Sequence, residues 1–292
     1  MNRQQVPAAL RIGVLPGLRP AVKLPGMSAS ANPPNAPLSL DALQAWHAGL
    51  AKAFESVDDE AFLSHLAAAL NALTPIESMM ISLERKGLPP QLLHEQGIVG
   101  AYRDEIINRY FSRGYLLDPF CLAVDQGLGE GFYTLGEIAP DDFFDSEYYK
   151  TYYLKAGSSE DSFYLVDTGN DTQISVSLFQ GFGGESLRVE QLNLLRAVEP
   201  LVREFIAEFG QRGLQHRADQ EASGRDDLKQ RVQSAFEHFG SDLLTERERE
   251  VAHMVLRGHS VKSTASQLNI SPETVRMHRK NLYLKLEVGS QS

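Results

Sequence analysis

The sequence contains little of what disulfide-bonded and membrane proteins need. Its 292 residues include one cysteine, Cys121, which excludes an internal disulfide and any zinc site made of cysteines alone. Its longest apolar stretches fall far short of the roughly 18 residues that cross a bilayer. We therefore expect a cytoplasmic protein with no membrane partner.

Catalytic motifs are also missing. The eight histidines are scattered without a metal-ligand spacing such as His-Glu-x-x-His, and the chain has no glycine-rich phosphate-binding loop of the Walker type. A lone thiol such as Cys121 is more typical of a small core residue than of a nucleophile. The sequence predicts no enzyme, no catalytic residue, no metal and no cofactor.

Charge is distributed unevenly along the chain. The net charge of −10 argues against a nucleic-acid partner, because polyanions repel each other. Residues 241–292, however, carry eight Lys and Arg against six Asp and Glu, a local charge of +2 that leaves −12 for residues 1–240. Within that part, residues 274–285 contain four basic residues and no acid. An acidic part is therefore joined to a part that can meet an anionic partner.

Composition and periodicity divide the chain into four parts. Residues 1–37 contain seven prolines and no sustained period, which predicts a flexible tail. Apolar residues make up 42% of the chain, which is enough for two hydrophobic cores. Residues 38–212 are expected to form the domain around the first of these cores. Residues 213–240 are expected to form a polar linker with a connecting helix. Residues 241–292 complete the chain as a second domain.

Residues 38–212 alternate between helical and strand-like patterns. Three- and four-residue apolar spacings predict helices over 39–54, 58–73, 98–113, 142–155 and 185–212. Runs rich in β-formers predict strands over 78–84, 91–95, 162–167 and 173–180, with a turn at 86–90 and a hairpin turn at 168–171. These elements predict an α/β/α sensor-like sandwich with a mostly antiparallel sheet, so that the whole chain is α+β with an all-α second domain.

Three short helices are expected in residues 241–292. Thr245 and Glu248 have the spacing of a capping box, and Gly258 lies where a left-handed residue ends the first helix. Ser260 can cap the second helix, and Ser271-Pro272 begins the third. Two short helices joined by a tight turn, the second one basic, are the parts of a helix-turn-helix that enters the major groove. The alternative is a small helical bundle with a solvated basic face.

The residues of this segment also resemble a known family. Leu244-Thr-Glu-Arg-Glu-Arg-Glu-Val251, residues 258–262 and residues 268–276 are similar to the DNA-binding domain of LuxR-type transcriptional regulators. The resemblance implies a homodimer on double-stranded DNA with a two-fold operator. Family members usually continue into a fourth helix, so either this sequence is truncated or pairing comes from the first domain and the helices of residues 185–239. The expected DNA-contacting residues are Arg276, Met277 and Lys280 at base edges, Lys262 and Arg279 at phosphates, and Thr274.

A weaker resemblance concerns residues 109–120. They are similar to the ligand domain of LuxR-type acyl-homoserine lactone receptors, in which a Tyr and an Asp-Pro pair hydrogen-bond the signal. Tyr110 and Asp118 would be the counterparts, with Tyr115 between them and Tyr102 nearby. Lactone receptors place a Trp where this chain has Ile106, and the Tyr-to-Asp spacing is one residue short, which favours a small-molecule effector other than a standard homoserine lactone. Tyr110 as core packing and Asp118 as a turn cap are the structural alternatives.

The segment from Asp141 to Tyr153 combines six aromatic residues with four acids. It could form a cage for a cationic amine, since aromatic faces and carboxylates both favour positive charge. A buried aromatic stripe with solvated acids opposite is the favoured interpretation. Taken together, the sequence predicts a ligand-responsive DNA-binding transcriptional regulator. The alternative is a regulator controlled by protein–protein interaction without a small-molecule ligand.

Overall fold

The computed structural model describes residues 38–85, 88–154, 158–169, 171–181, 186–212, 214, 234, 236 and 238–289. The expected tail at 1–37 and most of the expected linker at 213–240 lie outside the described residues.

A five-stranded antiparallel sheet with the order β2-β1-β5-β4-β3 forms the centre of the first domain. The strands are β1 (Ser78–Arg85), β2 (Leu88–Gln96), β3 (Gly131–Thr134), β4 (Glu160–Gly169) and β5 (Thr172–Gln180). The four predicted strands are confirmed, and β3 was not predicted. The predicted turn at 86–90 was too long, because Leu88, Pro89 and Pro90 already belong to β2. Proline is tolerated there because β2 is an edge strand.

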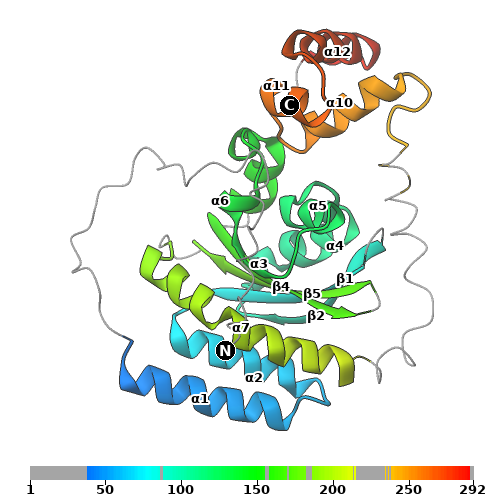
Figure 1. Cartoon of the computed structure of the whole chain (residues 1–292). Helices are drawn as coiled ribbons and strands as arrows, with labels where there is room; N and C mark the ends of the chain where they lie inside the picture. The colour runs from blue at the N-terminus through cyan, green and yellow to red at the C-terminus, as the bar shows by residue number, and fades with distance from the viewer. Residues whose placement is uncertain are drawn as a thin grey trace, which may run out of the picture.

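Helices α2 (Ala61–Leu73) and α7 (Val189–Arg212) cover one face of this sheet, and α1 (Leu40–Glu55) packs on α2 (Figure 1). Alternate residues of β1, Met79, Ile81 and Leu83, point into the core that these helices close. Phe62 of α2 stacks on Phe209 of α7 with ring centroids 4.7 Å apart. The two helices are thereby fixed against each other and against the sheet.

The opposite face carries short helical segments (Figure 1). They are α3 (Gly100–Arg103), a π-helical turn (Asp104–Arg109), α4 (Tyr110–Ser112), a 3-10 turn (Gly114–Leu117), α5 (Pro119–Asp125), α6 (Leu135–Ile138), a 3-10 turn (Phe143–Asp145) and a π-helical turn (Tyr149–Leu154). The prediction of a single helix over 142–155 is wrong, because the backbone is extended at Ser146. The Ser146 hydroxyl accepts from the Tyr149 N–H and caps a new helical segment. Helices on both faces of an antiparallel sheet confirm the predicted α/β/α sandwich.

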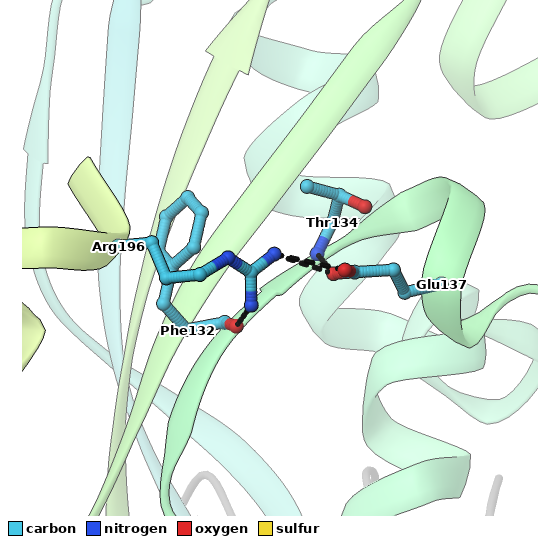
Figure 2. Close-up of polar contacts among 4 residues, drawn as sticks. All are labelled: Phe132, Thr134, Glu137 and Arg196. Atoms are coloured by element: carbon cyan, nitrogen blue, oxygen red, sulfur yellow. Dashed lines mark hydrogen bonds and ion pairs between the residues drawn. The ribbon is translucent and has the colours of Figure 1, made fainter. Parts of the chain in front are cut away.

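Arg196 of α7 ties the long helix to β3 and α6 (Figure 2). Its guanidinium donates to the Phe132 carbonyl at 2.8 Å and pairs with the Glu137 carboxylate at 2.8 Å. Glu137 in turn accepts from the backbone N–H of Thr134, which caps α6. The short edge strand is thus anchored by a charged network as well as by the sheet.

The second domain consists of α10 (Glu246–Leu256), α11 (Val261–Gln267) and α12 (Pro272–Lys285). Its small core contains Val251, Val255, Ala265, Val275 and Leu282. The predicted capping box is confirmed, since Thr245 accepts from the Glu248 N–H and Glu248 accepts from the Thr245 N–H. Ser260 and Ser271 cap α11 and α12 as predicted, and Gly258 has the expected positive φ of 83°.

Glu248 also joins the first helix of this domain to the end of the last. Lys285 donates to the Glu248 carboxylate at 2.6 Å. This bond and the backbone N–H of Thr245 lower the pKa of Glu248 to about 2. Among the described residues, no helix is long and apolar enough to cross a membrane.

Candidate ligand cavity and DNA-contacting helix

Helix α12 presents a basic surface on the side away from its core. Val275 and Leu282 are buried, whereas Arg276, Met277 and Lys280 are exposed. Met277 is 51% exposed and lies next to Arg276 on this face. The residues that the resemblance assigns to base edges therefore share one accessible face.

The other three expected DNA-contacting residues lie around this face. Lys262 is exposed on α11. Arg279 is half-buried and donates to the Tyr283 hydroxyl at 3.1 Å, so that its guanidinium is held close to the helix. Thr274 lies in the first turn of α12, where its N–H donates to the capping Ser271.

A cavity lies in the first domain, between the sheet and the short helical segments. Its walls combine two apolar residues, four polar or acidic ones and four tyrosines. They are Met80, Phe179, Asp118, Ser158, Asp161, Ser177, Tyr110, Tyr148, Tyr152 and Tyr153. Apolar walls with a few convergent polar groups are typical of small-molecule sites.

Tyr110 and Asp118 meet at this cavity. The Tyr110 hydroxyl donates to Asp118 Oδ2 at 2.6 Å and lies 3.3 Å from the Cys121 sulfur. Asp118 Oδ1 accepts from the Phe120 N–H at 2.9 Å and so caps α5. Asp118 therefore holds a turn and lines the cavity at once, and the two interpretations of this residue are compatible.

A second carboxyl group, Asp161 at the start of β4, faces the same cavity. Asp161 is 3% exposed, and among the described residues its Oδ1 has no hydrogen-bond partner; the same holds for the Tyr148 hydroxyl. Burial raises the pKa of Asp161 well above its ordinary value, and the neighbouring Asp118 raises it further. Burial also raises the pKa of Asp118 to about 6, against the hydrogen bonds from Tyr110 and Phe120.

The predicted ligand residues divide into three groups. Tyr110 and Asp118 line the cavity. Tyr115 is buried in the 3-10 turn after α4 and lines a different hollow, beside Glu84 and Cys121. The side chain of Tyr102 lies outside the described residues.

Several cavity residues were not predicted. Met80, Ser177 and Phe179 come from the central strands β1 and β5, which were predicted as strands without a site assignment. Asp161 lies in the polar stretch that precedes the apolar run beginning at Phe163, so no local sequence pattern marks it as buried. Tyr148, Tyr152 and Tyr153 of the 141–153 segment line the cavity, whereas the acids Asp142, Asp145 and Glu147 of this segment are exposed. The buried-stripe interpretation thus describes these acids correctly.

The loop before the cavity tyrosines contacts the second domain. The Ser260 hydroxyl donates to Asp141 Oδ2 at 2.6 Å, and the Ser260 N–H donates to Oδ1 at 3.2 Å. The Asp142 N–H donates to the carbonyl of Gly258 at 3.1 Å. Since Ser260 caps α11, this contact lies directly between a cavity wall and the helix-turn-helix.

Comparison with known proteins identifies the class. Residues 242–292 match the family model of bacterial regulatory proteins of the luxR family. An HTH-type transcriptional regulator in the exeN 3' region of Aeromonas salmonicida is 32% identical over 176 residues, which cover 60% of this chain and 89% of that protein. The chain belongs to the LuxR family of helix-turn-helix transcriptional regulators. It is a DNA-binding regulator and not an enzyme.

Other similar proteins share smaller parts or only a loose likeness. The transcriptional regulatory protein UhpA of Escherichia coli is 49% identical over 49 residues, which cover 17% of this chain and 25% of UhpA. The ligand-binding domain of VqsR from Pseudomonas aeruginosa is 25% identical, with a TM-score of 0.49, and the match covers 56% of this chain and 96% of that structure.

Proposed function

We propose that this regulator is controlled by a small molecule that binds in the cavity at Tyr110 and Asp118. The observation that carries the proposal is a cavity whose buried polar groups, Asp161 Oδ1 and the Tyr148 hydroxyl, lack partners among the described residues. A buried polar group without a hydrogen bond costs free energy, which a bound ligand would recover. The departures around Ile106 favour a ligand other than a standard homoserine lactone.

The DNA-reading surface in this proposal is the exposed face of α12. Arg276 and Lys280 can donate to guanine in the major groove, and Met277 makes apolar contact. Lys262 and Arg279 meet phosphates, and Thr274 lies at the same interface. One short helix contacts too few base pairs for useful specificity, so the active species is a homodimer on a two-fold operator in the cytoplasm.

Ligand binding would reach the DNA-binding domain through the loop at Asp141. Tyr148 and Tyr153 form one wall of the cavity, and the loop that precedes them binds Ser260 and Gly258. A ligand controls DNA binding only if its affinity differs between the two arrangements of the domains. If ligand binding moves this cavity wall, the contact with Ser260 at the N-terminal cap of α11 changes. The ligand would then favour one of the two arrangements of the domains.

The test uses an operator selected from random DNA with the full chain, placed before a reporter gene. Extracts of the cells that naturally make this regulator are expected to change reporter output when the wild-type protein is present. Ser177→Phe, which fills the cavity, should hold output at one level, whereas Ser177→Ala should respond like the wild type. Equal responses of all three proteins would overturn ligand control and favour regulation by a protein partner. Failure to select any DNA would overturn the DNA-reading assignment.

A further inference from the structure

The cavity brings together two carboxyl groups without a basic side chain. Asp118 comes from the cap of α5 and is 4% exposed, and Asp161 comes from β4 and is 3% exposed. None of the described residues that line the cavity is Lys, Arg or His. Buried carboxylates in proteins are normally paired with a cation or fully hydrogen-bonded. The cavity therefore has an excess of negative and acceptor groups.

The hydrogen-bonding capacity of the two acids is used to different extents. Both oxygens of Asp118 already accept, one from Tyr110 and one from the Phe120 N–H. Asp161 Oδ1 and the Tyr148 hydroxyl, by contrast, have no partner among the described residues. A ligand that brings hydrogen-bond donors would satisfy the ionised form of Asp161.

Aromatic rings form the rest of this side of the cavity. The rings of Tyr148 and Tyr152 lie with centroids 4.7 Å apart, and Tyr153 packs beside Tyr148 at 6.1 Å. The guanidinium of Arg109 lies 5.3 Å from the centroid of Tyr152, so this ring already attracts one cation. Electron-rich tyrosine faces next to carboxylates stabilise positive charge.

We propose that the effector carries a primary ammonium group, held between Asp118 and Asp161 against the ring of Tyr148. The three N–H groups of such an ion match the partners available: Asp161 Oδ1, the Tyr148 hydroxyl and a free lone pair of Asp118. Charge-assisted hydrogen bonds of this kind are stronger than neutral ones. The inference rests on the proposed function, since it names the ligand class of the same cavity.

The pH dependence of ligand affinity provides a second test of the proposal. Because the pKa of Asp118 is raised to about 6 and that of Asp161 is raised well above its ordinary value, the empty cavity keeps its protons to higher pH than exposed carboxyl groups do. An ammonium ion competes with these protons, so its affinity should rise from pH 5.5 to pH 8. A neutral ligand that accepts hydrogen bonds should show the opposite trend. The ionisable groups around the pair are Tyr110, Tyr148, Tyr153, Cys121, Glu84 and Glu160, with Arg109 behind Tyr152.

The experiment compares amines with alcohols of the same shape. The probes are hexylamine with 1-hexanol, 2-phenylethylamine with 2-phenylethanol, and N-hexanoyl-homoserine lactone as the neutral ligand of lactone receptors. Binding to the full chain is measured by calorimetry and by the thermal shift of Trp46 fluorescence. At least one amine should bind roughly tenfold or more tightly than its alcohol, because only the amine forms ion pairs with buried carboxylates.

Variants separate charge from shape. Asp161→Asn and Asp118→Asn should each abolish the preference for the amine while keeping the affinity for the alcohol. Asp145→Asn, which removes an exposed acid of the neighbouring segment, should leave the preference intact. An unchanged Trp46 spectrum shows that each variant is folded.

Two results would overturn the proposal. If no amine binds more tightly than its alcohol, or if both cavity variants keep the preference, the effector is not recognised as a cation. If only the neutral lactone binds, the effector is likewise not recognised as a cation, but the proposal that a small molecule controls the regulator still stands. The reporter response of Ser177→Phe tests ligand control independently of the probe chemistry.

Discussion

Glu84 allows a quantitative test of how burial acts in the first domain. This carboxyl lies on β1, is 7% exposed, and accepts from the hydroxyls of Ser82 at 2.9 Å and Ser175 at 3.0 Å. Burial raises its pKa from 4.5 to about 7, and the two hydroxyls counteract only part of that effect. Glu84→Gln removes the ionisation and keeps an oxygen that can accept from both serines.

The direction in which pH changes the stability of the folded state follows from proton binding by Glu84. Below pH 4.5 Glu84 is protonated in both folded and unfolded chains and costs nothing. As the pH rises toward 7, the unfolded chain loses this proton first, so the folded state is progressively destabilised. The shift from 4.5 to about 7 corresponds to a loss of about 3 kcal/mol by pH 8, at about 1.4 kcal/mol per unit.

Urea denaturation followed by Trp46 fluorescence measures this effect. Trp46 is the only tryptophan in the sequence and is 3% exposed in the first domain, so its signal reports on that domain. The stability advantage of Glu84→Gln over the wild type should grow by about 2 to 3 kcal/mol between pH 5 and pH 8. Glu147→Gln, an exposed acid, should show no such growth. A pH-independent difference for Glu84→Gln would refute the reasoning.

Three further predictions concern the second domain. Arg276→Ala should cost roughly 1–3 kcal/mol of operator affinity and relax preference at one base pair, as measured by fluorescence anisotropy on single-base operator variants. Unchanged affinity would contradict its assignment to a base edge. Lys262→Ala should weaken binding to all sequences alike and reduce the slope of log affinity against log salt by about one unit. A loss confined to one sequence would instead indicate base contact. A Cβ added at Gly258 would lie 2.8 Å from the Phe143 Cα, so Gly258→Ala should loosen the contact between the domains and increase the radius of gyration in X-ray scattering. Gly127→Ala, also at positive φ but with open space around it, is the matched control, and equal behaviour of the two variants would refute the contact.

Local sequence signals were sufficient to predict where the helices of the second domain begin and end. Thr245, Ser260 and Ser271 begin helices because their hydroxyls accept backbone N–H groups a few residues away, and Gly258 ends α10 because it adopts a positive φ. These interactions span three or four residues. They are therefore visible in the sequence without knowledge of the fold.

The cavity depends on contacts between distant parts of the chain. Asp118 and Asp161 lie 43 positions apart, and only the pairing of β4 in the sheet brings Asp161 toward α5. Strand β3 has four residues and no clear alternation, so its pattern was too short to detect. The break at Ser146 also escaped prediction, because the aromatic residues on either side continue a helical spacing.

Native mass spectrometry tests the central claim, that a small molecule occupies this cavity, most directly. Wild-type protein incubated with an extract of its own producing cells, then desalted, should carry one reproducible small-molecule mass at a stoichiometry of one per chain. The same mass should be retained by Ser177→Ala and lost by Ser177→Phe. If the wild type and Ser177→Phe carry the same masses, or if neither carries any, the cavity is not the site of a controlling ligand.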